Sequence, residues 1–152
     1  MRGDFWPARP TDGTPVIEVR DVKAGAAVSI KAGEPVIKDG GNAGYVKSPG
    51  ANCTTSTGIY GFALSDSTDT AAADGKVYVM LASDNVLWRG YAKAKANLAV
   101  AKKDTNVVID FTTPTYTVDE STTTNGICNI KDYDTTAGWI DFLCKASALP
   151  NA

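Results

Sequence analysis

The stretch Gly58–Ala82 constrains the fold more than any other part of the chain. It opens with a short apolar run, Ile59–Leu64, and closes with Lys76–Leu81, a run rich in β-branched and aromatic residues that follows Asp74-Gly75. A polar link of Ser, Asp, Thr and Ala residues separates the two runs. Two β-prone runs joined by turn residues predict a pair of antiparallel strands connected by an exposed loop. We therefore expect a small β protein that works through its surface.

Further short strands are predicted on both sides of this hairpin, because apolar and β-branched residues alternate there with polar ones. The predicted strands are Val16–Lys23, Val28–Ile30, Pro35–Lys38, Asn85–Ala92, Val107–Thr112 and Tyr116–Val118. The segment Asp39–Thr57 is rich in Gly, Asn, Ser and Thr, which predicts a long loop with at most one short strand at Tyr45–Lys47. Lys93–Lys103 is expected to be a loop with one turn of helix.

A second hairpin is predicted at Gly126–Lys145, which repeats the order of the first in shortened form. Each of the two segments begins with Gly-Ile and contains an Asp-Thr pair in its central link. In each, a glycine then precedes the second predicted strand. We expect the paired hairpins to close one small barrel. Cys128 and Cys144 fall on neighbouring strands with parities that let them face each other, so a disulfide is conceivable. Two reduced thiols are the favoured state, because the first residues carry no secretory signal.

Residues 1–15 are expected to form an extended N-terminal arm, because they contain three prolines and show no apolar period. One interpretation is a frayed terminus. The other is an arm that docks on a partner, since two adjacent aromatic residues, Phe5 and Trp6, are unfavourable in water. Residues 16–149 are expected to form a single β domain, which is long enough to bury its own core.

The residues needed for catalysis or metal binding are sparse. The chain has no histidine, and its three cysteines form no CxxC pair, so we expect neither an enzyme nor a metal or other cofactor. Ser65-Asp66 lacks the frame of a nucleophile elbow, and the acidic link Asp66, Asp69 and Asp74 lacks the closing Glu of a calcium loop. That link is interpreted as a solvated loop, and Asp119-Glu120 as an exposed turn.

Charge and hydropathy exclude two further classes of partner. The 15 basic and 17 acidic residues give a net charge of −2 and are interspersed, whereas nucleic-acid-binding proteins usually show a basic patch. No run approaches the roughly 20 apolar residues of a membrane helix. We therefore expect neither nucleic acid nor a membrane as partner.

Taken in order, several segments between residues 24 and 145 resemble the capsid decoration, or cement, proteins of tailed bacteriophages. These segments are the turn at Lys31–Val36, the strands at Gly61–Leu64 and Asp74–Leu81, the Trp-Arg-Gly step at Trp88–Gly90 and the hairpin turn at Asp134–Gly138. The resemblance implies an all-β fold, a small antiparallel β-barrel or β-tulip-like domain with long loops. It also implies homo-oligomers, with a trimer favoured, that bind the major capsid protein. Such a protein is assembled in the host cytoplasm and lies on the outer surface of the virion.

Arginine and aromatic residues are the candidates for these contacts, because both are enriched at interface hot spots. The candidates for capsid contact are Arg2, Phe5, Trp6 and Arg9, and those for a subunit interface are Trp88 and Arg89. Packing in the core or at the barrel end is the other interpretation of Trp88. The alternative function is a carbohydrate- or host-surface-binding β module of a phage fibre or adhesin, in which exposed Trp and Tyr rings stack on sugars.

Overall fold

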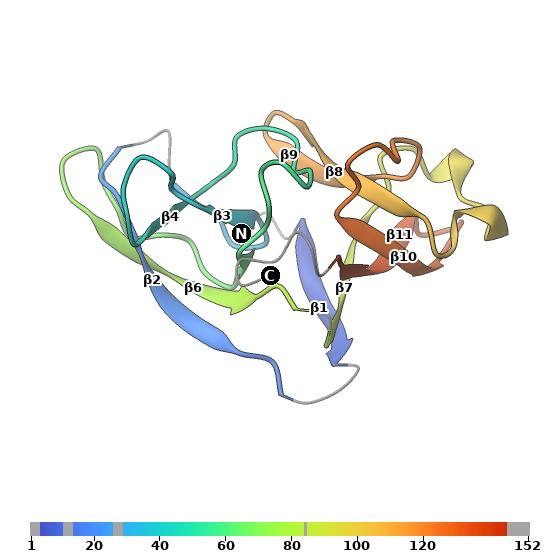
Figure 1. Cartoon of the computed structure of the whole chain (residues 1–152), viewed down its shortest axis with the longest axis horizontal. Coiled ribbons are helices and arrows are strands. Elements are labelled where there is room, and N and C mark those ends of the chain that lie inside the picture. Colours follow the sequence, from blue (N-terminus) through green and yellow to red (C-terminus); the bar gives the residue numbers. More distant parts are fainter. Residues whose placement is uncertain (1–3, 11–13, 26–28, 84, 146–152) are drawn as a thin grey trace.

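The computed structural model describes residues 4–10, 14–25, 29–83 and 85–145. The chain is nearly all-β and consists of a closed five-stranded barrel and a six-stranded antiparallel sheet, which lie on the left and right of Figure 1. The predicted all-β class and the predicted barrel are therefore confirmed. The second sheet is an addition to the predicted architecture.

The barrel contains most of the strands predicted in the first half of the chain. In order around the barrel they are β2 (Ile17–Val22), β4 (Tyr45–Lys47), β3 (Pro35–Lys38), β5 (Gly61–Ala63) and β6 (Gly75–Leu81). All neighbours are antiparallel except β2 and β4, which run parallel. Small apolar side chains such as Val22, Val36 and Val79 fill the interior. No strand forms at Ser29 and Ile30, although Ile30 is buried in the same cluster.

The second sheet is built from the N-terminal strand and the second half of the chain. Its order is β1 (Phe5–Pro10), β7 (Val86–Tyr91), β11 (Trp139–Cys144), β10 (Cys128–Tyr133), β8 (Asn106–Thr112) and β9 (Thr115–Asp119). Two short 3-10 turns, η2 (Lys95–Asn97) and η3 (Val100–Lys102), lie in the connection between β7 and β8, where a single turn of helix is predicted.

Both predicted hairpins are confirmed, but they do not close one barrel. β5 and β6 pair antiparallel within the barrel, with Gly61 opposite Leu81. β10 and β11 pair antiparallel within the six-stranded sheet, with Cys128 opposite Cys144. The prediction of one shared barrel is therefore wrong. The second hairpin carries apolar residues that pack across the outer face of the first hairpin instead of extending its hydrogen-bonded ring.

An aromatic cluster joins the barrel to the sheet. Phe62 of β5 lies on the outer face of the barrel, where it contacts the six-stranded sheet. Its ring centroid is 4.2 Å from that of Trp88, 5.1 Å from that of Phe5 and 6.1 Å from that of Phe142. Barrel and sheet therefore share a hydrophobic core, which is separate from the cluster inside the barrel.

The N-terminal residues form an edge strand rather than a projecting arm. β1 pairs with β7, with Phe5 opposite Gly90, and the Phe5 N–H donates to the Gly33 carbonyl of the barrel at 2.9 Å. The Phe5 ring is only 3% exposed. Residues 5–10 are extended, as predicted, but burial of Phe5 and pairing with β7 make them part of the β domain, so the prediction of an arm separate from that domain is wrong for these residues.

Candidate functional site

The structure separates the candidates for capsid contact. Phe5 is buried in the shared core, so its assignment as a contact residue is wrong. Trp6 is partly buried and packs edge-on against the half-exposed Tyr91, with ring centroids 5.6 Å apart. Arg9 is exposed, and Arg2 lies outside the described residues. Trp6 and Arg9 can therefore reach a partner.

The two candidates for a subunit interface are occupied within the chain. Trp88 is fully buried at the centre of the aromatic cluster, so it cannot contact another subunit and the core interpretation is confirmed. Arg89 donates to both carboxylate oxygens of Asp141, at 2.7 and 2.9 Å. Its guanidinium also lies 3.8 Å from the centre of the Trp139 ring. Both partners of Arg89 lie on β11, so this side chain holds β7 and β11 together.

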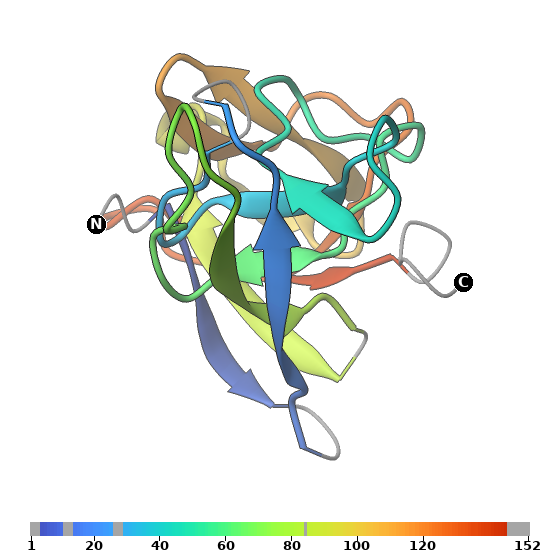
Figure 2. The same ribbon diagram turned by 90° about the vertical axis from the view of Figure 1, so that its left-hand side faces the viewer.

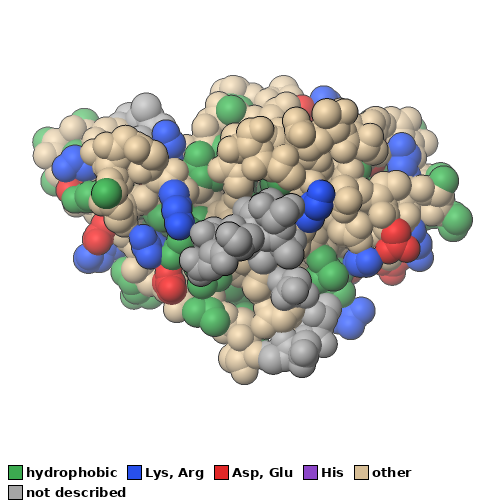
Figure 3. Space-filling model, viewed as in Figure 1, with side chains coloured by type: hydrophobic (Ala, Val, Ile, Leu, Met, Phe, Trp, Pro, Cys, Tyr) green, Lys and Arg blue, Asp and Glu red, His purple; other side chains and the backbone are tan. Residues whose placement is uncertain are grey.

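Four large apolar side chains are exposed on the outer face of the barrel. Ile17, Val19, Leu64 and Tyr78, which we call the apolar strip, are each between 38% and 55% exposed. Val19 lies opposite Tyr78 on the paired strands β2 and β6, and the Leu64 N–H donates to the Tyr78 carbonyl at 2.8 Å. Figure 2 shows β2 facing the viewer, and Figure 3 shows hydrophobic side chains at the surface over β2 and β6.

The strip exists because β2 turns its charged residues toward Tyr60. A half-buried strand usually buries its apolar side, but here Glu18 and Arg20 occupy the side that faces the barrel. The Arg20 guanidinium donates to the Tyr60 hydroxyl at 2.8 Å, and that hydroxyl donates to the Glu18 carboxylate. Burial and the Glu18 carboxylate raise the pKa of Tyr60 above its ordinary value. These contacts leave Ile17 and Val19 pointing to solvent.

A small apolar pocket adjoins the strip. It has a volume of about 280 Å³ and lies where β1 meets the barrel, lined by Phe5, Trp6, Pro7, Ala32, Gly33, Ala63 and Leu64. Leu64 belongs to both the strip and the pocket, so the two form one surface. None of the lining side chains carries a charge. Cofactor and drug-sized sites are commonly about 300–1,000 Å³ and contain a few placed polar groups. This pocket therefore suits an apolar side chain of a protein partner better than a cofactor.

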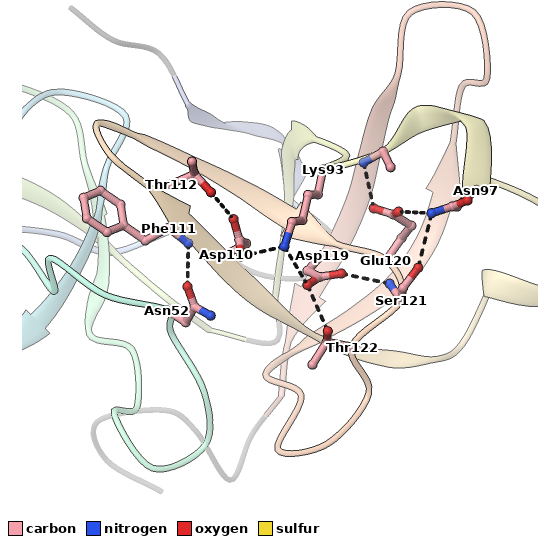
Figure 4. A network of polar contacts seen from close by, with 11 residues as sticks. Asn52, Lys93, Asn97, Asp110, Phe111, Thr112, Asp119, Glu120, Ser121 and Thr122 are labelled. Carbon is pink, nitrogen blue, oxygen red and sulfur yellow. Dashed lines mark hydrogen bonds and ion pairs between the residues drawn. The ribbon is translucent and has the colours of Figure 1, made fainter.

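A buried polar network connects the β7–β8 segment to β8 and β9 (Figure 4). The prediction that Asp119-Glu120 is an exposed turn is wrong, because these residues are only 7% and 1% exposed. Lys93 lies 2.9 Å from Asp110 and 3.5 Å from Asp119. Glu120 accepts hydrogen bonds from the Asn97 side chain at 3.0 Å and from the Ala94 N–H at 3.3 Å. The carboxylates are used to fix this segment on the sheet.

The acidic link between β5 and β6 also serves the fold. Asp66 accepts a hydrogen bond from the Ala32 N–H at 2.9 Å, and Asp74 accepts one from the Ala24 N–H at 2.8 Å. These hydrogen bonds lower the pKa of both carboxyl groups. Asp69 accepts one from the Ser29 hydroxyl at 2.6 Å. The link therefore braces the loops of the barrel rather than being merely solvated.

The three cysteines are free and buried in the shared core. Burial raises the pKa of the Cys53 thiol to about 12 and also raises the pKa of Cys128 and Cys144. Because the thiolate is the reactive form, these thiols are inert at neutral pH. In the described part of the chain, no three His, Cys, Asp or Glu side chains are grouped so that they could hold a metal ion. Nor is any helix there long and apolar enough to cross a membrane.

Comparisons with protein-family models, with curated proteins and with solved structures found no match for this chain. The geometry of the apolar strip and its pocket is therefore the main guide to function.

The buried network makes stability depend on pH. Burial alone would raise the pKa of Asp119, but the Thr122 hydroxyl, the Ser121 N–H and Lys93 lower it below its ordinary value of 3.8. The ionised form therefore stabilises the fold above that pH, and this contribution is lost as the pH falls through the lowered pKa. We expect the free energy of unfolding to fall more steeply below about pH 4 for the wild type than for Asp119→Asn. Urea unfolding at several pH values across this range measures the free energy of unfolding of the wild type and of Asp119→Asn. An equal dependence on pH in the two proteins would contradict the lowered pKa of Asp119.

Proposed function

We propose that this protein binds the outer surface of a phage capsid and stabilises the head, as a decoration protein. The apolar strip with its adjoining pocket is the observation that carries the proposal. Its side chains lie close together, because Val19 is opposite Tyr78 and the Leu64 N–H is bonded to the Tyr78 carbonyl. Contiguous apolar patches exposed on a monomer often mark interaction sites.

The size of this surface favours a partner that offers many identical sites. A stable one-to-one complex usually buries about 800 Å² and roughly 20–30 residues on each partner, whereas the strip and the pocket together comprise ten residues. Weak contacts repeated over a shell gain strength from avidity. The major capsid protein is such a partner, and homo-oligomers such as the trimer implied by the resemblance would multiply the same surface.

The polar side chains support binding rather than catalysis. The carboxylates of the buried network are engaged in holding segments together, and the thiols are buried with raised pKa values. The chain also lacks histidine, the commonest general base. A nucleophile paired with a base does not occur among the described residues that form the strip and pocket.

A carbohydrate- or host-surface-binding module is the second candidate. The partly buried Trp6 packed against the half-exposed Tyr91 favours it, because such rings can stack on sugars. The neighbouring pocket argues against this candidate. Sugar hydroxyls need hydrogen-bond partners when they lose water, and among the side chains that line the pocket only the Trp6 indole N–H can form a hydrogen bond.

Binding to phage heads tests the proposal. Purified protein is added to heads of the phage whose genome encodes it, prepared without this protein, and the heads are then pelleted. We expect saturable co-sedimentation of many copies per head and no specific signal on a glycan array. Heads that pellet without bound protein, together with a clear glycan signal, would favour the second candidate.

A further inference from the structure

Strand β2 has an open edge within the otherwise closed barrel. It pairs with β6 along its whole length but with β4 only at Asp21 and Val22. The Leu81 N–H donates to the Val16 carbonyl, and alternate residues of an antiparallel strand bond to the same neighbour. The N–H and C=O groups of Ile17 and Val19 therefore point away from β6. Within the part of the chain that the structure describes, these groups have no hydrogen-bond partner.

The two edges of the six-stranded sheet are protected, in contrast to this edge. In β1, Pro7 and Pro10 have no N–H to offer, and the Phe5 N–H is bonded to Gly33. At the other edge, the Lys93 N–H donates to the Val118 carbonyl of β9 at 2.8 Å. Proline and covering segments are common ways to prevent unwanted pairing of sheet edges. The fold thus blocks two edges and leaves that of β2 available.

We propose that the Ile17–Val19 edge pairs antiparallel with the same edge of a second copy of this chain. This inference goes beyond the proposed function and does not rest on it. A two-fold axis beside Glu18 sets Ile17 of each copy opposite Val19 of the other. The unpaired N–H and C=O groups then form four hydrogen bonds across the axis. The same residues supply the free backbone and the exposed apolar side chains, so the edge is complementary to itself, as an isologous interface requires.

Charges near the axis are compatible with this pairing. The two Glu18 side chains face each other across the axis, but each carboxylate is already bound to the Tyr60 hydroxyl and lies 3.5 Å from Arg20 in its own copy. Diagonal neighbours on paired strands are within reach of long side chains, so Arg20 of each copy can also approach Glu18 of the other. The charge on each Glu18 is therefore balanced from two sides.

The pairing is expected to be weak in solution. Four or five residues on each side bury much less than the roughly 800 Å² per partner of a stable complex. We expect a reversible monomer–dimer equilibrium with a dissociation constant between about 1 μM and 1 mM. Local concentration on a repetitive surface would strengthen the same contact.

Amide hydrogen exchange, measured by NMR at increasing protein concentration, tests the proposal together with sedimentation equilibrium. We expect the Ile17 and Val19 amides to become protected as the dimer forms. The Glu18 amide, which is bonded to β6, should keep the same protection at every concentration. A chain that stays monomeric up to about 1 mM would overturn the proposal. So would a dimer or trimer in which the Ile17 and Val19 amides exchange as fast as in the monomer.

Two variants separate the edge from the apolar face. Val19→Pro removes an N–H that makes no bond to β6, so the barrel should fold and the dimer should be lost. Ile17→Lys is a second edge variant that keeps the backbone and places a charge beside the pairing site. Tyr78→Ser is the control, because it changes the same face but not the edge, and it should still dimerise. Undiminished dimerisation of both folded edge variants would refute the pairing.

Discussion

Phe62→Ala is expected to lower the free energy of unfolding by about 3–5 kcal/mol, the usual loss for a buried aromatic residue. Phe62 is fully buried and packs against rings of both β1 and β7. Its removal leaves a cavity where the barrel meets the six-stranded sheet, so both parts lose contacts. Urea unfolding of the wild type and the variant, followed by tryptophan fluorescence, measures the difference.

Tyr78→Ala is the matched control for Phe62→Ala. Tyr78 is also aromatic and also lies on the outer face of the barrel, but it is 55% exposed. Its replacement should change the free energy of unfolding by no more than about 0.5 kcal/mol, as is usual at the surface. If the two variants lost equal stability, the shared core would not depend on the aromatic cluster.

Gly90→Ala is expected to cost about 3 kcal/mol or more, because it displaces Phe5 from the core. A Cβ atom at Gly90 would lie 2.4 Å from two carbon atoms of the Phe5 ring. Gly90 and Phe5 lie opposite each other on β7 and β1, so the missing side chain makes room for the ring. Thermal or urea unfolding measures the loss.

Gly40→Ala and a double-mutant cycle control the Gly90 experiment. A Cβ atom at Gly40 meets nothing within 4 Å, so this variant should keep the stability of the wild type. Phe5→Ala removes the ring that Gly90→Ala displaces, so the double variant should lose much less than the sum of the two single losses. Additive losses would mean that the two positions do not interact.

The contact between Phe5 and Gly90 also affects how an N-terminal truncation must be interpreted. If residues 1–15 formed an arm separate from the β domain, their removal would weaken attachment without unfolding the barrel. The structure places Phe5 in the shared core and β1 in the sheet, so that deletion removes a strand and a core side chain. Point variants of Trp6 or Arg9, which lie nearer the surface, are the better probes of attachment.

Local sequence patterns were sufficient to predict most strands and both hairpins. The β-branched and aromatic run Lys76–Leu81 and the alternation in Val107–Thr112 depend on neighbouring residues alone, and both correspond to observed strands. The assembly of hairpins into sheets depends on residues far apart in the chain. Phe62 packs against Phe5 and Phe142, and no local pattern indicates which hairpin covers that ring.

The candidate site was less predictable for the same reason. Alternation in β2 shows that it has two different faces, but not which of them is buried. The outcome depends on Tyr60, about 40 positions away, which binds Glu18 and Arg20 and so turns Ile17 outward. The pocket likewise combines Phe5 and Trp6 with Leu64 from a distant strand. The available signal was the alternation of apolar and charged residues in β2. It indicates that one side of the strand is apolar, but not that this side is exposed.

The number of copies that co-sediment with phage heads, measured for the wild type and two matched variants, tests capsid binding through the apolar strip most directly. Leu64→Asp places a charge where strip and pocket meet, and Val100→Asp places one on an apolar residue of η3 that is 75% exposed and outside the strip. We predict saturable binding of the wild type and of Val100→Asp, and at least a tenfold weaker affinity, about 1.4 kcal/mol, for folded Leu64→Asp. Equal binding of all three proteins, or no binding of the wild type, would contradict the account.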